Sequence, residues 1–426
     1  MKRFLLMVLI IMFFSINSYT QKLGKGWKLS GQIQIRSELD GRDFSNNTHP
    51  LTFSSMRTRL GIKKSFEDKL SFFVQISDSR IFGEEQSSLK SINRIDLHQG
   101  YVKLNNLFDW KWSLQVGRFE VSYGTQRFFG AVGWHFVGRS FDGIRFNIAP
   151  KKLNLDLFAL TVKESNKYIG NAKPSIYPNT HIVSPSNSIY GFWQKNVFGN
   201  GAKLDLFGYY DVNRTEVAKD TKKLSLFTVG STFWGKIGKI STIVEGGFQF
   251  GSNMGKDVSA YLVSAKGAYN LGDTKLGFGV DILSGTNPSK TNNINTFSPS
   301  YGTNHKFYGF MDYFINVPVN SNNLGLNDFY VSSTFTPRDS KFLFKVVLHH
   351  FMSNKSANIL VGSAAFPTSE NIFGQEADLI VKYKFIKGTT LTWGGSFFLP
   401  GNLMKFKFNN RDDVAFWSYF MLTASL

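Results

Sequence analysis

Apolar and polar residues alternate one by one along much of this chain. Leu114 and Val116, for example, alternate with Ser113 and Gln115, and the polar Arg145 stands between the apolar Ile144 and a phenylalanine. Successive side chains of a β-strand point to opposite faces, so this alternation predicts strands with one apolar and one polar face. Soluble sandwiches and membrane barrels both show this pattern, which leaves open which face meets water.

About 18 alternating segments follow one another along the chain. They cover residues 27–39, 52–65, 68–82, 92–105, 110–121, 139–149, 151–163, 188–198, 202–214, 223–236, 239–251, 257–270, 273–285, 325–336, 341–352, 373–386, 389–399 and 412–426. An even number of strands is what a closed barrel requires if both chain ends are to lie on the same side of a membrane. The last segment is expected to pair with the first, which leaves no open sheet edge in lipid.

The connections between these segments alternate in length. Tight links, such as 66–67, 237–238 and 387–388, alternate with mostly longer polar links, notably 164–187, 286–324 and 353–372. Short periplasmic turns that alternate with longer external loops are typical of outer-membrane barrels, and a soluble sandwich does not require this order. The pattern therefore predicts an all-β protein, a transmembrane antiparallel outer-membrane β-barrel of about 18 strands. Residues 305–314 are assigned to a loop that folds into the pore, because an extra strand would break the parity.

The N-terminus resembles a secretory signal. Lys2 and Arg3 precede an apolar run over residues 4–14, which is too short to span a bilayer as a helix. A membrane-anchored N-terminus is the alternative. We expect residues 1–20 to be a cleaved signal peptide and residues 21–426 to form a single barrel domain. The chain has no cysteine, which excludes disulfides, thiolate metal sites and a lipoprotein anchor, and its 43 Phe, 16 Tyr, 8 Trp and 39 Gly suit a barrel wall with aromatic girdles.

The formal net charge is +19, and the basic residues are scattered along the alternating segments. In residues 52–65, Arg57 and Arg59 share one face while Met56 and Leu60 share the other. A guanidinium that faces lipid costs about 2–4 kcal/mol at the midplane, so the basic face should line the lumen. The same parity places a further set of charges inward, namely Arg36, Arg145, Lys345, Glu376 and Asp378. A charged outer surface of a soluble domain is the alternative explanation, and an inward charge can also serve only to pair with its neighbours.

Several short motifs recur in an order that resembles the bacterial alginate export family of outer-membrane porins. They are Gly117-Arg118, Tyr123-Gly124, Gln126-Arg127, Trp134, Arg139-Ser140-Phe141-Asp142-Gly143, Ser284-Gly285-Thr286-Asn287, Tyr301-Gly302, His305, Tyr308-Gly309, Asp312 and Gly374-Gln375-Glu376-Ala377-Asp378. The resemblance implies a porin whose loops fold inward and narrow the pore. It adds Arg127, Arg139 and Asp142 to the predicted pore-lining residues. From the residues alone, an exposed outer loop is an equal alternative for this passage.

The function predicted from these features is an outer-membrane porin with an arginine-rich, anion-selective pore. Arginine binds a carboxylate with two hydrogen bonds, so arginines along a pore suit an alginate-like polysaccharide, which carries carboxylates. Carboxylates interspersed among the arginines would keep the binding affinity at each site low enough for release. The alternative is a general porin for small anionic solutes. No nucleophile motif is present, and the adjacent His349 and His350 point to opposite faces, so we expect no enzyme, cofactor or metal. The expected partners are outer-membrane lipid, the anionic solute and periplasmic export components, with no nucleic acid, and the expected state is a monomer.

Overall fold

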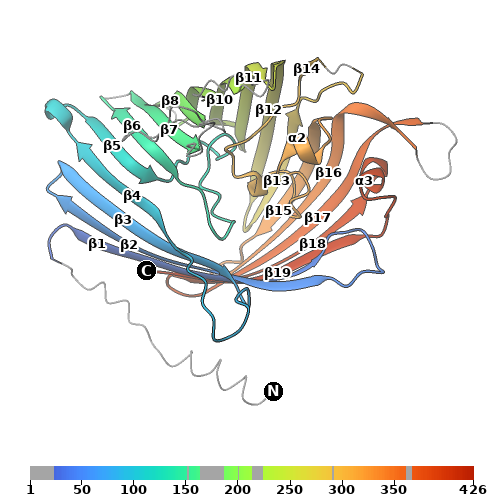
Figure 1. Ribbon diagram of the computed structural model, residues 1–426, viewed down its shortest axis with the longest axis horizontal. Coiled ribbons are helices and arrows are strands. Elements are labelled where there is room, and N and C mark those ends of the chain that lie inside the picture. The colour runs from blue at the N-terminus through green and yellow to red at the C-terminus, as the bar shows by residue number, and fades with distance from the viewer. Residues whose placement is uncertain are drawn as a thin grey trace, which may run out of the picture.

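The computed structural model describes residues 24–150, 153–163, 187–199, 201–213, 224–289, 292–360 and 367–426. Within these ranges the chain forms one antiparallel barrel (Figure 1). Its strands are β1 (Trp27–Gly41), β2 (Leu51–Phe66), β3 (Leu70–Ile81), β4 (Ile95–Asn105), β5 (Trp112–Phe119), β6 (Phe141–Ile148), β7 (Asn154–Lys163), β8 (Asn187–Val197), β9 (Lys203–Asn213), β10 (Leu224–Ile237), β11 (Ile240–Asn253), β12 (Lys256–Leu271), β13 (Thr274–Leu283), β15 (Leu326–Phe335), β16 (Phe342–Ile359), β17 (Thr368–Ile386), β18 (Thr389–Pro400) and β19 (Ala415–Ser425).

The barrel closes where its first and last strands meet. β1 pairs with β19 from Gln32↔Ser425 to Gly41↔Phe416, and with β2 on its other side. The short β14 (Asn293–Ile294) pairs only with β12, in parallel, while β13 pairs directly with β15. The wall of described residues therefore has 18 antiparallel strands, which confirms the predicted fold class.

The two faces of the wall follow the predicted parity. Leu60 and Ile62 on β2 are 49% and 46% exposed, whereas Arg57 and Arg59 on the same strand are 4% and 8% exposed. Because a lipid-facing charge is costly, the face with Leu60 is the one that suits the membrane, and the arginines lie inside.

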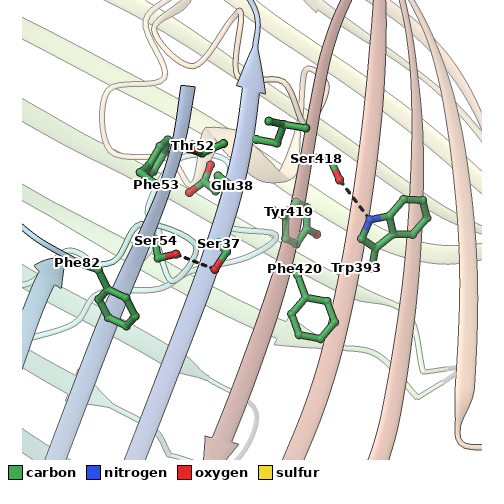
Figure 2. A pocket seen from close by; sticks show the side chains of 11 residues that line it. Ser37, Glu38, Thr52, Phe53, Ser54, Phe82, Trp393, Ser418, Tyr419 and Phe420 are labelled. Carbon is green, nitrogen blue, oxygen red and sulfur yellow. Dashed lines mark hydrogen bonds between the residues drawn. The ribbon is translucent and has the colours of Figure 1, made fainter. Parts of the chain in front are cut away.

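A hollow of about 540 Å³ lies across β1, β2, β18 and β19. Figure 2 shows Ser37 hydrogen-bonded to Ser54 (Oγ to Oγ, 2.7 Å), and Trp393 Nε1 donating to Ser418 Oγ (3.2 Å). Ser418 in turn donates to the carbonyl of Gly394. These four polar side chains are thus paired within the wall, which fits a face that contacts lipid acyl chains.

The connections largely match the sequence-based expectation, with one correction. The predicted loop 353–372 is too long, because β16 continues to Ile359 and β17 begins at Thr368. The pairing of these two strands has register shifts between Phe351 and Ala357. Hydrogen bonds between the two strands support this extension, although its residues lack the apolar alternation of a lipid-facing strand. The assignment of residues 305–314 to an inward loop is confirmed, because His305 and Phe314 in it are buried inside the barrel.

Among the described residues there are also four short helical turns: η1 (Leu107–Asp109), η2 (Asn304–Lys306), α2 (Val317–Asn320) and α3 (Asn402–Lys407). No helix among the described residues is long and apolar enough to cross a membrane. The predicted signal peptide (1–20) and most of the predicted loop 164–187 lie outside the described residues.

Candidate solute pathway

Of the connections that the structure describes, two fold into the barrel and fill much of its interior. The first inner loop, residues 120–140, joins β5 to β6, and the second inner loop, residues 292–325, leads into β15 and contains η2 and α2. Figure 1 shows both within the ring of strands. Phe128, Phe129, Phe297 and Phe314 in these loops are at most 2% exposed. The loops therefore form part of the protein core.

Aromatic rings join the two loops to the wall. Phe129 stacks on Tyr301 of the second inner loop, with ring centres 5.6 Å apart and planes at 10°. Phe128 contacts Phe207 of β9, which stacks on Trp193 of β8. Such ring pairs stabilise a packed arrangement beyond their buried area. One side of the lumen, along β8 and β9, is thereby filled with aromatic side chains.

Backbone hydrogen bonds also connect the two inner loops. Gly130 N–H donates to the carbonyl of Tyr301 (2.9 Å), and Thr303 N–H donates to the carbonyl of Gln126 (2.8 Å). The Trp134 ring stacks on the His305 ring, with centres 4.1 Å apart. The two loops therefore act as one folded unit across the lumen.

Gly302 is required for this close approach, since a Cβ there would lie 2.3 Å from the carbonyl oxygen of Arg127. We expect Gly302→Ala to weaken the packing of the loops by about 1–3 kcal/mol and to increase proteolysis within residues 120–140. Gly133→Ala is the matched control, because nothing lies within 4 Å of its Cβ position. Equal protease resistance of the two variants would contradict this role.

Arg127 fastens the first inner loop to β11, β12 and β13. Its Nε donates to Glu245 Oε2 (3.1 Å), and its two Nη atoms donate to both oxygens of Asp281 (3.0 Å each). Ser264 Oγ and Tyr308 OH accept two further hydrogen bonds. The side chain is fully buried. Because a guanidinium has five N–H donors and this one makes five bonds, Arg127 is an anchor and is not available to a solute.

On the opposite wall, arginines hold the first inner loop through its carbonyl groups. Arg57 Nη1 donates to the carbonyls of Gly133 (3.1 Å) and His135 (3.0 Å). Arg36 Nη1 donates to the carbonyl of Trp134 (2.8 Å) and lies over its ring, with Cζ 4.0 Å from the ring centre. The predicted pore-lining arginines thus have a structural contact that sequence parity could not reveal.

Arg59 makes the third such contact. Its Nη2 donates to the carbonyl of Val137 (2.8 Å), and its Nη1 pairs with Glu120 at 3.2 Å. His98 Nε2 lies 2.7 Å from the same Glu120 oxygen. Burial acts to raise the pKa of Glu120, but the His98 hydrogen bond and the charge of Arg59 outweigh it and lower that pKa. Glu120 is therefore ionised and neutralises Arg59.

The remaining predicted basic residues also lie inside the barrel. Arg139 donates to the carbonyl of Gly302 (3.2 Å), and Arg145 donates to Gln115 Oε1 (2.6 Å). The Lys345 ammonium lies over a phenylalanine ring of the second inner loop, 5.2 Å from its centre. In the part of the chain that the structure describes, none of these three cations forms an ion pair.

The two predicted carboxylates on β17 are buried against the second inner loop and the wall. Glu376 Oε1 accepts a hydrogen bond from Met311 N–H (2.9 Å). Asp378 accepts one from Ser396 Oγ (2.5 Å) and lies 3.7 Å from His349 Nε2. Glu376 therefore fixes the second inner loop, as Arg127 fixes the first.

Asp142 is a correction. It pairs with Arg118 across β5 and β6 (2.8 Å), and its side chain is 59% exposed. It shares the outward face of β6 with Ile144, near the end of the strand that adjoins the first inner loop, so it does not line the pore. Charges are tolerated on the outward face near the membrane boundary, where the penalty falls to about 0–1 kcal/mol.

A cavity of about 470 Å³ remains between the inner loops and the wall at β1, β2 and β19, and we call it the arginine cavity. Arg36, Arg139 and His135 are among its lining residues. Burial and the charges of Arg36, Arg57 and Arg139 lower the pKa of His135. Burial lowers the pKa of Arg139 as well. At His135 the charges of the three arginines outweigh that of Asp312, so this part of the cavity favours an anion.

Three residues of this cavity were not among the predicted pore-lining residues: Arg42, which no sequence pattern singled out, and His305 and Asp312, which belong to the family motifs. Arg42 forms a two-pronged ion pair with Asp40 and donates to the carbonyl of Met311. His305 Nδ1 lies 2.7 Å from Asp312. Arg42 is six residues after the inward-facing Arg36, so alternation by twos also places it inward and would have identified it.

A closed barrel with an apolar outer face and a lumen narrowed by inward loops defines an outer-membrane channel of the porin class. The sequence model of the alginate export family matches residues 27–415, which is nearly the whole chain. The chain therefore belongs to that family. No curated protein matches the sequence.

Solved structures agree on the fold. Pseudomonas aeruginosa OccK8 (OprE) is similar with a TM-score of 0.59 and 13% identity, over 94% of this chain and 98% of that one. Acinetobacter baumannii OccAB4 gives a TM-score of 0.57 and 12% identity, over 94% and 98%. P. aeruginosa OccK2 (OpdF), solved in complex with glucuronate, gives 0.57 and 11% identity, over 94% and 96%. At these identities the similarity establishes the shared barrel.

Proposed function

We propose that this protein is an anion-preferring outer-membrane channel that passes an acidic polysaccharide of the alginate type. One observation carries the proposal: the lining of the arginine cavity and the wall beside it hold cations that no carboxylate neutralises. Arg36, Arg42 and Arg59 each pair with a carboxylate, but Arg57 and Arg139 have no such partner among the described residues. A polyuronate carries one carboxylate per sugar, which a guanidinium binds well.

The mixture of paired and unpaired cations suits transport. Conduction requires each site to be strong enough for entry and weak enough for release. The carboxylates of Glu38, Asp40 and Glu120 reduce the field around three of the arginines. We further propose that residues 1–20 are removed on export, that the rest forms one monomeric barrel domain, and that it performs no catalysis.

A second candidate is a general porin for small anionic solutes. The dense packing of the inner loops favours it, because a long polymer needs a continuous path past them. The related barrel OccK2 (OpdF) was solved with glucuronate, a single sugar acid. Both functions use the same positive cavity, and they differ in the length of the solute that enters.

Measurements in planar bilayers test the selectivity. With a salt gradient across the wild-type channel, the reversal potential should have the sign expected for a channel that conducts anions better than cations. Selectivity should weaken from 0.1 M to 1 M salt, because the Debye length falls from about 10 Å to about 3 Å. Oligouronates should block the current reversibly. Cation preference would refute anion selectivity, whereas free passage of small anions without oligouronate block would favour the general porin.

A further inference from the structure

A second positively charged cavity lies on the inner face of β11 to β16, on the far side of the second inner loop from the arginine cavity, and we call it the lysine pocket. Its volume is about 360 Å³, within the range typical of small-ligand sites. Four lysines line it: Lys266, Lys275, Lys306 and Lys345. Three stand on the wall strands β12, β13 and β16, and Lys306 ends η2 of the second inner loop.

The lysine pocket lies toward the end of the barrel with the short turns. Lys275 follows the two-residue turn between β12 and β13, and Thr334, another lining residue, lies next to the last residue of β15. Both chain ends of the barrel lie at this end as well. Short turns mark the periplasmic side of outer-membrane barrels, so a solute from the periplasm reaches this pocket before the arginine cavity.

The four ammonium groups are available to a ligand. Within the described ranges, none of them forms an ion pair or a hydrogen bond, although Lys266 and Lys345 are partly buried. The two carboxylates of the lining are already engaged, because Asp281 binds Arg127 and Asp328 binds His349 (2.9 Å). Partly buried charges without a partner favour an anionic ligand that supplies one.

The rest of the lining suits a sugar. Lys266 Nζ lies 5.8 Å from the centre of the Phe307 ring, and Lys345 Nζ lies 5.2 Å from that of Phe310. Hydroxyl groups of Ser241, Tyr330, Ser332 and Thr334 also line the pocket, and that of Tyr308 accepts a hydrogen bond from Arg127. Ring faces pack against the C–H face of a sugar, hydroxyls exchange hydrogen bonds with it, and ammonium groups bind its carboxylate.

Two inward glycines on β13 provide the space. A Cβ on Gly279 would lie 2.4 Å from the Tyr330 ring, and one on Gly277 would lie 2.5 Å from Ser332 Oγ. Any larger residue at these positions would displace those side chains. The concave wall of the lysine pocket therefore depends on glycine, as the close approach of ligand to backbone often does.

We propose that the lysine pocket is a loading site on the periplasmic side, which binds one carboxylate-bearing sugar of the solute before it reaches the arginine cavity. This inference rests on the proposed function, since it assumes that acidic sugars pass through the barrel. Lysine suits a loading step, because its ammonium is a mobile, strongly hydrated point charge that releases a carboxylate more readily than the two-pronged guanidinium. The pocket and the arginine cavity would then be successive weak sites.

The test compares block of the channel from its two sides. We expect a mannuronate oligomer added on the short-turn side to half-block the Lys266→Gln/Lys345→Gln variant only at an at least tenfold higher concentration than the wild type. That shift corresponds to about 1.4 kcal/mol. Block from the other side should be unchanged. The matched control is Lys63→Gln/Lys103→Gln, which removes the same charge at inward positions of β2 and β4 on the opposite wall.

A second measurement separates this proposal from the proposed function. Calorimetry with D-glucuronate on the detergent-solubilised protein should show binding by the wild type and by the control, and loss of binding in Lys266→Gln/Lys345→Gln. If oligomers never block the wild-type channel but glucuronate binding is lost in the variant, the lysine pocket is supported as a binding site, whereas passage of a polysaccharide is refuted. If the variant and control shift block equally, or glucuronate does not bind the wild type, the pocket proposal is overturned. Equal competition by succinate would overturn its specificity for sugars.

Discussion

Replacing Arg127 with methionine should release the first inner loop from β11, β12 and β13 and destabilise the protein by about 3–5 kcal/mol. The variant leaves Glu245 and Asp281 buried at 1% exposure without the guanidinium that pairs with both. An uncompensated buried charge is among the most destabilising changes known. We expect a lower denaturant midpoint of unfolding, and a larger single-channel conductance because the loop no longer narrows the lumen.

A charge-balanced variant provides the control for this prediction. Arg127→Met/Glu245→Gln/Asp281→Asn removes the cation together with both anions, so much of the stability should return. The conductance should stay raised, because the amides cannot replace the ion pairs that fasten the loop. A single Arg127→Met variant with wild-type unfolding and conductance would show that the other contacts of the loop hold it in place without Arg127.

Replacing Arg57 with glutamate should have the largest effect on selectivity. It converts an unpaired cation beside the arginine cavity into an anion, and places a carboxylate against the carbonyls of Gly133 and His135. Anion selectivity should fall several-fold, and block by oligouronates should be lost. The barrel should still fold, since lumen positions tune selectivity more than they stabilise the wall.

Two further variants show whether charge or loop position causes this effect. Arg57→Lys keeps the charge but cannot reach both carbonyls with one planar group, so it should retain anion selectivity with weaker block. Arg94→Glu makes the same charge change on the connection between β3 and β4, where Arg94 pairs with Glu84, and should alter neither property. Unchanged selectivity in Arg57→Glu would rule out the arginine cavity as the selectivity site.

The resemblance by sequence pointed to the correct family, but it misled on one residue. Asp142 belongs to a motif shared with that family, so the resemblance predicts a pore-lining position for it. Ile144, two residues later, faces outward, so alternation alone places Asp142 outward too, where it pairs with Arg118. The structure shows that local alternation was the sounder guide here, because neighbouring strands keep a fixed period of two.

The wall of the barrel could be determined from the sequence by itself. Alternation is a local property, and the penalty for a charge in lipid decides which face is outward, so Arg57 and Leu60 could be assigned without knowledge of any contact. Strand parity then required β1 to meet β19, as it does.

The interior was decided only by the tertiary structure. Arg127 meets Asp281, 154 residues away, and Arg57 meets the carbonyl of Gly133, 76 residues away. No periodicity links such positions, because the inner loops have no repeating backbone geometry and their contacts depend on how the closed wall brings distant strands together. Parity identified Arg57 as inward-facing, and the family resemblance added Arg127, but which of them holds a loop and which faces the solute depends on the folded arrangement.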